Sequence, residues 1–204
     1  MTPIVLRSGD LNHNELDTAL DIAIIGAGVA GLTCARQLQL AGYRVALIDK
    51  SRGLGGRLAT RRLSGETHAD HGVCYLQPKH PAFTELLQEL AQSGILSVWP
   101  ARRYGLSAEG ALIPESKPKG NTISVPCYAS ETGITALAKA LAVGLRVERG
   151  QRAIALELDT RSTSAGWRVT AESGRVFTAQ QLVIAIPAPP GDRPPRNPAR
   201  FCQF

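Results

Sequence analysis

The stretch that decides the fold is "DIAIIGAGVAGLTCARQLQLAGYRVALID", residues 21–49. Its first five residues form a short apolar run, which predicts a buried strand. Residues 26–31, "GAGVAG", predict a turn, and the pattern of residues 29–42 predicts a helix. Residues 43–49, "YRVALID", predict a second buried strand. A strand, a helix and a strand in about 30 residues form a βαβ unit, so the sequence predicts a parallel sheet.

The turn contains the pattern GxGxxG, formed by Gly26, Gly28 and Gly31. The first glycine permits the tight turn, the second lets the backbone approach a pyrophosphate, and the third lets the helix pack closely on the strand. The start of the helix offers free N–H groups to phosphates. Asp49 ends the second strand, where a carboxylate accepts hydrogen bonds from a ribose hydroxyl and repels a 2′-phosphate. The unit therefore predicts a site for FAD or NAD, and argues against NADP.

A basic, glycine-containing segment, "KSRGLGGRLATRR", follows the acid at residues 50–62. Gly55 and Gly56 would let the backbone approach a ligand, and Arg57 would place a guanidinium on the same pyrophosphate. Arginine suits this role because it is always charged and donates to paired oxygens. The alternative is a solvated basic loop. A second contact with the pyrophosphate favours FAD over NAD.

Residues 21–62 resemble the FAD-binding start of the flavin amine oxidase superfamily. More narrowly, they resemble the renalase-like bacterial oxidoreductases, in which a segment similar to "SRGLGGRLATRR" follows the acid. "ADHGVCYL", residues 69–76, is similar to the next family segment, where Gly72 would bring the backbone close to the flavin. The resemblance covers about residues 21–188 and implies non-covalent FAD. The predicted cofactor-binding residues are Gly26, Ala27, Gly28, Ala30, Gly31, Asp49, Lys50, Arg52, Gly56, Arg57 and Gly72.

The resemblance also implies the fold class and the domain organisation. We expect an α/β protein with a Rossmann-type FAD-binding domain of the glutathione-reductase type and part of an α+β substrate domain. The expected parts are a flexible extension (1–20), the FAD-binding domain (21–75 and 131–188), the partial substrate domain (76–130) and a disordered Pro/Arg-rich tail (189–204). Because family members are longer, and the family-like "LVIAIPAP" gives way abruptly to "PPGDRPPRNPARFCQF", we expect a truncated or frameshifted member.

The activity implied by the resemblance is transfer of a hydride from a small substrate, dihydronicotinamide-like or amine-like, to flavin N5, with oxygen as the acceptor. No catalytic residue is predicted, because the flavin carries the difficult chemistry and a dihydronicotinamide gives up its hydride without losing a proton. Two other readings stay open: an NAD-dependent dehydrogenase that uses the same βαβ unit, and a non-catalytic, truncated nucleotide-binding remnant.

Composition restricts the partners further. The net charge is +6, but the densest arginines lie beside the dinucleotide motif without interleaved aromatic residues, so no nucleic acid is expected. The longest apolar run is interrupted by glycines, and the first 20 residues do not have the pattern of a signal peptide, so a cytoplasmic protein without membrane contact is expected. The sequence predicts a small-molecule substrate and leaves the oligomeric state open.

Metal and thiol chemistry is not indicated. The four cysteines form no CxxC pair, which favours reduced, structural thiols. His68, Asp70 and His71 lie close together, but there is no distant third ligand, so we interpret them as a loop near the flavin rather than a metal site. Trp99 and Tyr104, with Arg102 and Arg103, are candidates for a substrate pocket, although packing is the favoured role of Trp99.

The rest of the chain predicts further elements. Residues 81–94 predict a helix with one apolar face, and residues 132–144 predict another. Residues 95–100 predict a strand, and residues 100–130 predict hairpins and loops. Alternating patterns predict an antiparallel pair, residues 152–158 with 166–172, and a third short strand near residues 175–179. Residues 181–187, "QLVIAIP", predict a separate strand that is buried on both faces of a parallel sheet.

Overall fold

The computed structural model describes residues 20–64, 67–99, 104–114, 126–159 and 166–187. The chain divides into two compact units. Unit 1 consists of Met1–Ala59 and Ala138–Phe204, and unit 2 consists of Thr60–Leu137. The predicted extension, residues 1–20, lies outside the described residues except for Leu20, and the predicted tail, residues 189–204, lies wholly outside them.

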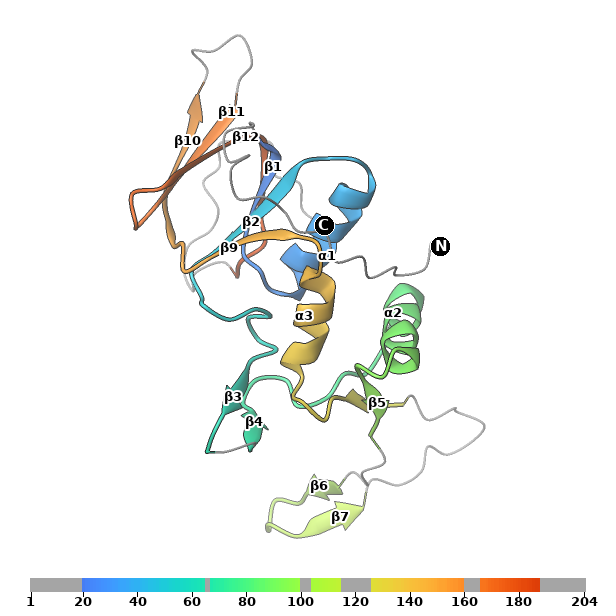
Figure 1. Ribbon diagram of the computed structural model, residues 1–204. Helices are drawn as coiled ribbons and strands as arrows, with labels where there is room; N and C mark the ends of the chain where they lie inside the picture. Colours follow the sequence, from blue (N-terminus) through green and yellow to red (C-terminus); the bar gives the residue numbers. More distant parts are fainter. Residues whose placement is uncertain (1–19, 65–66, 100–103, 115–125, 160–165, 188–204) are drawn as a thin grey trace. The chain divides into compact units, whose positions relative to one another are not determined.

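Unit 1 contains a six-stranded sheet in the order β10-β11-β12-β1-β2-β9 (Figure 1). Strands β12, β1, β2 and β9 run parallel, whereas β10, β11 and β12 form an antiparallel meander. The elements are β1 Leu20–Ile25, α1 Val29–Leu40, β2 Val45–Asp49, β9 Arg146–Arg149, β10 Ala153–Asp159, β11 Gly166–Ala171 and β12 Val176–Ile184. The predicted βαβ unit and the predicted antiparallel pair are both confirmed.

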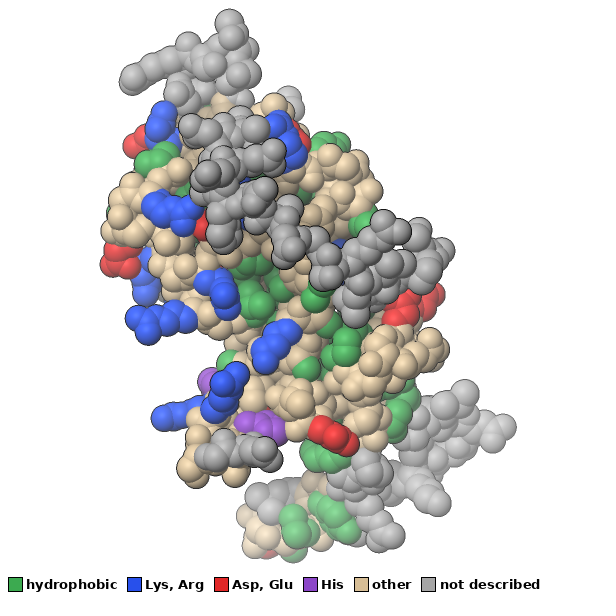
Figure 2. All heavy atoms as spheres, in the orientation of Figure 1, with side chains coloured by type: hydrophobic (Ala, Val, Ile, Leu, Met, Phe, Trp, Pro, Cys, Tyr) green, Lys and Arg blue, Asp and Glu red, His purple; other side chains and the backbone are tan. Residues whose placement is uncertain are grey.

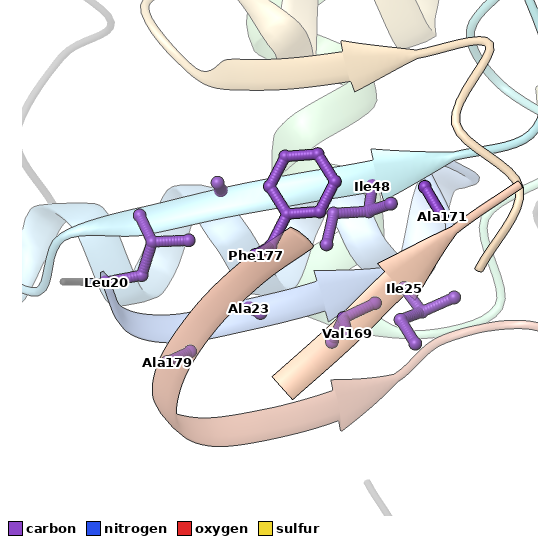
Figure 3. Close-up of a cluster of buried hydrophobic side chains, with 9 residues drawn as sticks. Leu20, Ala23, Ile25, Ile48, Val169, Ala171, Phe177 and Ala179 are labelled. Carbon is purple, nitrogen blue, oxygen red and sulfur yellow. The ribbon is translucent and has the colours of Figure 1, made fainter. Parts of the chain in front are cut away.

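The middle of this sheet forms an apolar core because its strands carry almost no polar side chains. Every residue of β1 is buried except Asp21, and every residue of β2 is buried except Asp49. Figure 3 shows side chains of β1, β2, β11 and β12 gathered in one cluster, with the ring of Phe177 near Ile48 and with Val169 near Ile25. Full burial of a valine, isoleucine or phenylalanine side chain contributes about 1.5–3 kcal/mol, so this cluster stabilises the strands that end at the glycine turn.

Strand β12 differs from the prediction in two ways. The expected short strand near residues 175–179 and the expected strand at 181–187 are one continuous strand, Val176–Ile184. The prediction that its second half is buried on both faces is wrong, because Gln181 and Ile184 are exposed and the two residues between them are half-buried. The strand is continuous because β12 pairs with β11 of the antiparallel meander and with β1 of the parallel strands, so its two halves belong to one sheet.

The described residues of unit 2 form one complete helix and three small two-stranded sheets. Helix α2, Pro81–Gln92, buries Leu87 and Leu90, as its apolar pattern predicts. Proline occupies its first turn, and the His80 ring Nδ1 accepts a hydrogen bond from the Ala82 N–H at 3.3 Å. The sheets pair β3 Thr60–Arg62 with β4 His68–Asp70, β5 Ser97–Val98 with β8 Tyr128–Ala129, and β6 Tyr104–Leu106 with β7 Leu112–Pro114. Helix α3, Thr135–Ala142, begins in unit 2 and ends in unit 1.

The cysteines that the structure describes, Cys34, Cys74 and Cys127, are free thiols. Burial raises the pKa of the Cys34 thiol, which lowers its reactivity at neutral pH. Within the described ranges, the helices are all too short or too polar to cross a membrane.

Candidate functional site

Two glycines of the GxGxxG turn are enclosed by the protein itself. Gly26 has a φ of +106°, and a Cβ added to it would lie 2.8 Å from the Ala185 carbonyl oxygen and 2.8 Å from Ile186 Cγ2. At Gly31 an added Cβ would lie 1.9 Å from the Gly26 carbonyl oxygen. These positions therefore serve the tight turn and the close approach of α1, as predicted from the pattern.

The middle glycine of the same turn faces open space. Gly28 precedes the first residue of α1, with φ −73° and ψ 176°, and an added Cβ would meet nothing within 4 Å. Because the capping residue is a glycine, no side chain caps the start of α1, and the first turn of α1 contains no acidic residue. The first N–H groups of a helix have no partner within the helix, so this end is suited to an anion.

Asp49 is fixed beside this turn by two backbone groups. Its Oδ2 accepts a hydrogen bond from the Ala27 N–H at 2.6 Å, and its Oδ1 accepts one from the Ser51 N–H at 2.7 Å. A carboxylate has about four acceptor sites, so both oxygens can accept a further bond. The carboxylate therefore has a fixed orientation at the end of β2, next to the open Gly28.

The second glycine segment returns to the first turn. The Gly55 N–H donates to the Ala27 carbonyl oxygen at 3.0 Å, and Gly28 and Gly55 form a parallel β-bridge. On its other side, a Cβ added to Gly55 would lie 2.9 Å from the Ala138 Cβ of α3. The backbone N–H of Gly55 is thus hydrogen-bonded within the protein. At Gly56, by contrast, the nearest neighbour of an added Cβ would be the Gly28 Cα, at 3.7 Å.

The side chains around the acid are basic. Lys50, Arg52 and Arg57 are exposed, and Figure 2 shows lysine and arginine side chains recurring over the visible face. Arg149 of β9 lies opposite Asp49 in the parallel register, and its Nη1 donates to the Arg52 carbonyl oxygen at 3.5 Å. Residue spacing alone gave no signal for Arg149, because it lies far along the sequence and only strand pairing brings it here.

Beside Arg149, Glu148 anchors strand β9. Its Oε2 lies 2.8 Å from Arg175 Nη1, and its Oε1 lies 3.1 Å from Arg146 Nε. Burial raises the pKa of this carboxyl, but the hydrogen bonds from Arg175 and Arg146 outweigh burial and hold the pKa below its usual value. Arg175 also lies 5.0 Å from the centre of the Phe177 ring. This network joins β9 to the meander, so it supports the edge strand that carries Arg149.

In unit 2, the expected loop at His68, Asp70 and His71 is partly a strand, because His68–Asp70 form β4. Asp70 ends β4, and its carboxylate accepts hydrogen bonds from the Thr60 hydroxyl and the Ile134 N–H. Among the residues that the structure describes, no group of three or more His, Cys, Asp or Glu residues is placed to hold a metal ion. Gly72 is exposed two residues after Asp70, and its contact with a flavin stays a prediction.

The aromatic candidates of unit 2 are partly exposed. The Trp99 ring is 44% exposed, and its centre lies 5.7 Å from the ring of Tyr75, with 45° between the planes. Tyr104 is 49% exposed, and Arg102 and Arg103 lie outside the described residues. Trp99 therefore packs against the Tyr75 ring while staying partly exposed, and a substrate pocket at these residues stays a prediction.

Comparison with known proteins adds a family resemblance. The family described as NAD(P)-binding Rossmann-like domain matches residues 24–90. An L-amino-acid oxidase of Siganus canaliculatus is 41% identical over 70 residues, which are 34% of this chain and 13% of that protein. A protein of Mycobacterium tuberculosis named as a flavin-containing monoamine oxidase is 37% identical over 71 residues, 35% of this chain and 15% of that protein.

The fold has a similar relative among solved structures. Putrescine oxidase bound to putrescine superposes with a TM-score of 0.64 at 16% identity, over 83% of this chain and 58% of that one. The chain therefore spans less than two thirds of these relatives. The comparisons confirm a mixed α/β structure with a Rossmann-like nucleotide-binding domain, and over about a third of the chain they show similarity to proteins named as amino-acid and flavin-containing monoamine oxidases.

Proposed function

We propose that this amine-oxidase-like chain is an FAD-dependent oxidoreductase of the renalase-like group, with an FAD-binding domain of the glutathione-reductase type. Residues 21–75 and 131–188 would form that domain, and residues 76–130 would form part of the substrate domain. The proposal is supported by the oxidase relatives, by the Rossmann-like match and by the basic segment after Asp49. We further propose a cytoplasmic protein that acts on a small molecule, without nucleic acid or membrane partners.

The observation that carries the proposal is the open, uncapped start of α1 beside the oriented carboxylate of Asp49. The unfilled space at Gly28 fits a pyrophosphate, because its backbone has nothing within 4 Å on the side where a Cβ would lie. Asp49 is held at the end of β2, where it would accept hydrogen bonds from the adenosine ribose. These residues therefore fit the ADP half of FAD.

Other residues have roles that follow from their chemistry. Arg52 and Arg57 would bind the pyrophosphate through their guanidinium groups, and Lys50 adds positive charge beside them. Gly56 lies next to Gly28 and would leave room for the ligand. The remaining members of the predicted set, Ala27, Ala30 and Gly72, would contribute backbone contacts. A bound flavin supplies the redox chemistry, acceptance of a hydride at N5, and we propose oxygen as the final electron acceptor and a dihydronicotinamide-like or amine-like substrate.

A second candidate is an NAD-dependent dehydrogenase, which is favoured by the description of the matching family as NAD(P)-binding. The geometry at Gly28 and Asp49 suits the ADP half of NAD as well as that of FAD. The Gly56–Arg57 segment is the feature that favours FAD, because it adds a second contact with the pyrophosphate. A nucleotide-binding domain without catalytic activity is the third reading.

The test is to express the 204-residue chain, record its visible spectrum, and titrate the flavin-free protein with FAD and with NADH. We expect a yellow protein, or saturable FAD uptake, that is lost in Gly28→Val because the side chain fills the pyrophosphate space. Gly105→Val is the matched control, since Gly105 is another open glycine, on β6 of unit 2, with its nearest neighbour 3.9 Å away. A colourless chain that binds NADH would favour the dehydrogenase, and no uptake of either nucleotide would overturn both enzyme readings.

A further inference from the structure

A set of side-chain and backbone hydrogen bonds in unit 2 joins the β3–β4 hairpin to the start of α3. The Thr60 hydroxyl donates to Asp70 Oδ1 and accepts from the Thr135 N–H at 3.1 Å and from the Thr135 hydroxyl at 3.0 Å. The Thr60 N–H donates to the Thr135 hydroxyl at 2.9 Å. The Ile134 N–H donates to both oxygens of Asp70, at 3.0 and 3.1 Å. We call this set, Thr60, Asp70 and Thr135, the polar lock.

At the polar lock, the β3–β4 hairpin packs closely against the residues that precede α3. Gly133 has a φ of +90°, and a Cβ added to it would lie 2.3 Å from Thr60 Cγ2, so only glycine lets the hairpin approach this near. Asp70 and Thr60 are directly opposite each other in the hairpin register. All three side chains are half-buried. Hydrogen bonds to a half-buried carboxylate contribute more to the stability of the fold than those to an exposed one. The lock thus satisfies N–H groups at the start of α3, the role of a helix cap.

The position of the lock in the sequence gives it a second consequence. Asp70 is the last residue of β4, and His71 and Gly72 follow it directly. Consecutive Cα atoms are about 3.8 Å apart, so fixing Asp70 keeps the Gly72 Cα within about 7.6 Å of the Asp70 Cα. The Cys74 thiol also lies 3.7 Å from the Asp70 carbonyl oxygen, which shows that the chain folds back on Asp70 after this glycine.

We propose that Thr60, Asp70 and Thr135 are positioning residues that order the Asp70–Cys74 segment and thereby place the Gly72 backbone for the cofactor. This inference rests on the proposed function, in which Gly72 approaches the flavin. The three side chains need not touch the cofactor, because they act through the backbone that follows Asp70. The Asp70 carboxylate is accordingly occupied by protein donors rather than held ready for a metal or a proton transfer.

The test compares four variants of the full chain with the wild type. Thr60→Val removes the hydroxyl at nearly constant shape, and Thr60→Ser keeps the hydroxyl. Thr132→Val is the matched control, because it removes an exposed hydroxyl from the loop that precedes α3. Thr135→Val is a milder second variant that keeps its backbone bond to Thr60, for use if Thr60→Val does not fold.

Two readouts need no cofactor: hydrogen exchange at the Ile134 and Thr135 amides, and the alkylation rate of Cys74. We expect Thr60→Val to speed exchange at these amides at least tenfold and alkylation several-fold, while Thr60→Ser and Thr132→Val stay near the wild type. Unchanged amide exchange in Thr60→Val would overturn the lock. Faster exchange with unchanged Cys74 alkylation would overturn its role in ordering the Asp70–Cys74 segment.

Two further readouts use the flavin: its dissociation constant and its visible circular dichroism, which reports on the surroundings of the ring. We expect about tenfold weaker FAD binding and an altered spectrum in Thr60→Val, with recovery of both in Thr60→Ser. If amide exchange is faster in Thr60→Val but the flavin spectrum is unchanged, the proposed positioning of the Gly72 backbone at the cofactor is overturned. A wild-type chain that takes up no flavin would instead overturn the proposed function, and exchange and alkylation would still decide whether the lock orders Asp70–Cys74.

Discussion

Gly26 and Gly31 are tightly enclosed by the protein, whereas Gly28, which lies between them, faces open space, and Gly56, in the second glycine segment, has only an ordinary contact. An added Cβ would meet a carbonyl oxygen at 2.8 Å at Gly26 and at 1.9 Å at Gly31, but nothing within 4 Å at Gly28. At Gly56 its nearest neighbour would be the Gly28 Cα at 3.7 Å. The enclosed pair serves the packing of the turn, and we propose that Gly28 and Gly56 leave room for a ligand. Substitutions to alanine should therefore separate the two pairs by their free energies of unfolding.

The largest effect is expected for Gly31→Ala. Alanine usually stabilises a helix relative to glycine by about 0.5–1 kcal/mol. Here its Cβ would lie 1.9 Å from the Gly26 carbonyl oxygen, so α1 must move away from β1. We expect a loss of about 3 kcal/mol or more in the free energy of unfolding, measured by urea denaturation, since overpacking costs about 1–3 kcal/mol or more. A neutral or stabilising result would show that the helix is not held against the turn.

A somewhat smaller loss is expected for Gly26→Ala. Its φ of +106° is unfavourable for alanine, and the new Cβ would contact the Ala185 carbonyl oxygen and Ile186 Cγ2. We expect a loss of about 2 kcal/mol by urea denaturation. The effect of Gly26→Ala should also be measured in an Ile186→Ala background, which removes the side-chain contact. We expect the loss in the free energy of unfolding to be smaller there but not zero, because the contact with the Ala185 carbonyl oxygen remains. Full recovery would mean that the side chain, and not the strained turn, explains the loss.

The sequence predicted the parts of the site that depend on local spacing. The βαβ unit, the glycine turn and the acid at the end of β2 lie within residues 21–49, and periodicity and motif spacing act at that range. The roles of Gly55 and Arg149 could not be predicted in this way. Gly55 pairs with Gly28 and contacts Ala138, and Arg149 reaches the site by strand pairing. Contacts of this kind depend on the tertiary fold.

The same limit explains the two larger differences in the fold. Apolar residues near the end of β12 predicted burial on both faces, but a run of apolar residues does not reveal what covers a strand. The sequence interpretation of His68, Asp70 and His71 is a loop, whereas His68–Asp70 form β4, and residue spacing gave no sign of what binds the Asp70 carboxylate. Its actual partners, Thr60 and Ile134, lie 10 and 64 residues away along the chain.

At the other pair, Gly56→Ala should have a smaller effect. Gly56 has a φ of +56°, the left-handed region, which costs a residue with a Cβ about 1–2 kcal/mol. No close contact adds to this cost, so we expect a loss of about 1 kcal/mol by urea denaturation. Gly56→Asn should lose less, because asparagine adopts this conformation more readily. A loss as large as that of Gly31→Ala would place Gly56 with the enclosed glycines.

The smallest effect on folding is expected for Gly28→Ala. Its φ of −73° and ψ of 176° are open to any residue, and its Cβ would project into space with nothing within 4 Å. We expect the free energy of unfolding to change by no more than about 0.5 kcal/mol, since alanine also restricts the unfolded chain. Titration with FAD should nevertheless show at least tenfold weaker binding, because the methyl group would occupy the space proposed for the pyrophosphate. Wild-type affinity in a stable Gly28→Ala chain would contradict the placement of the phosphates at this turn, whereas a loss of stability like that of Gly31→Ala would remove the distinction between enclosed and open glycines.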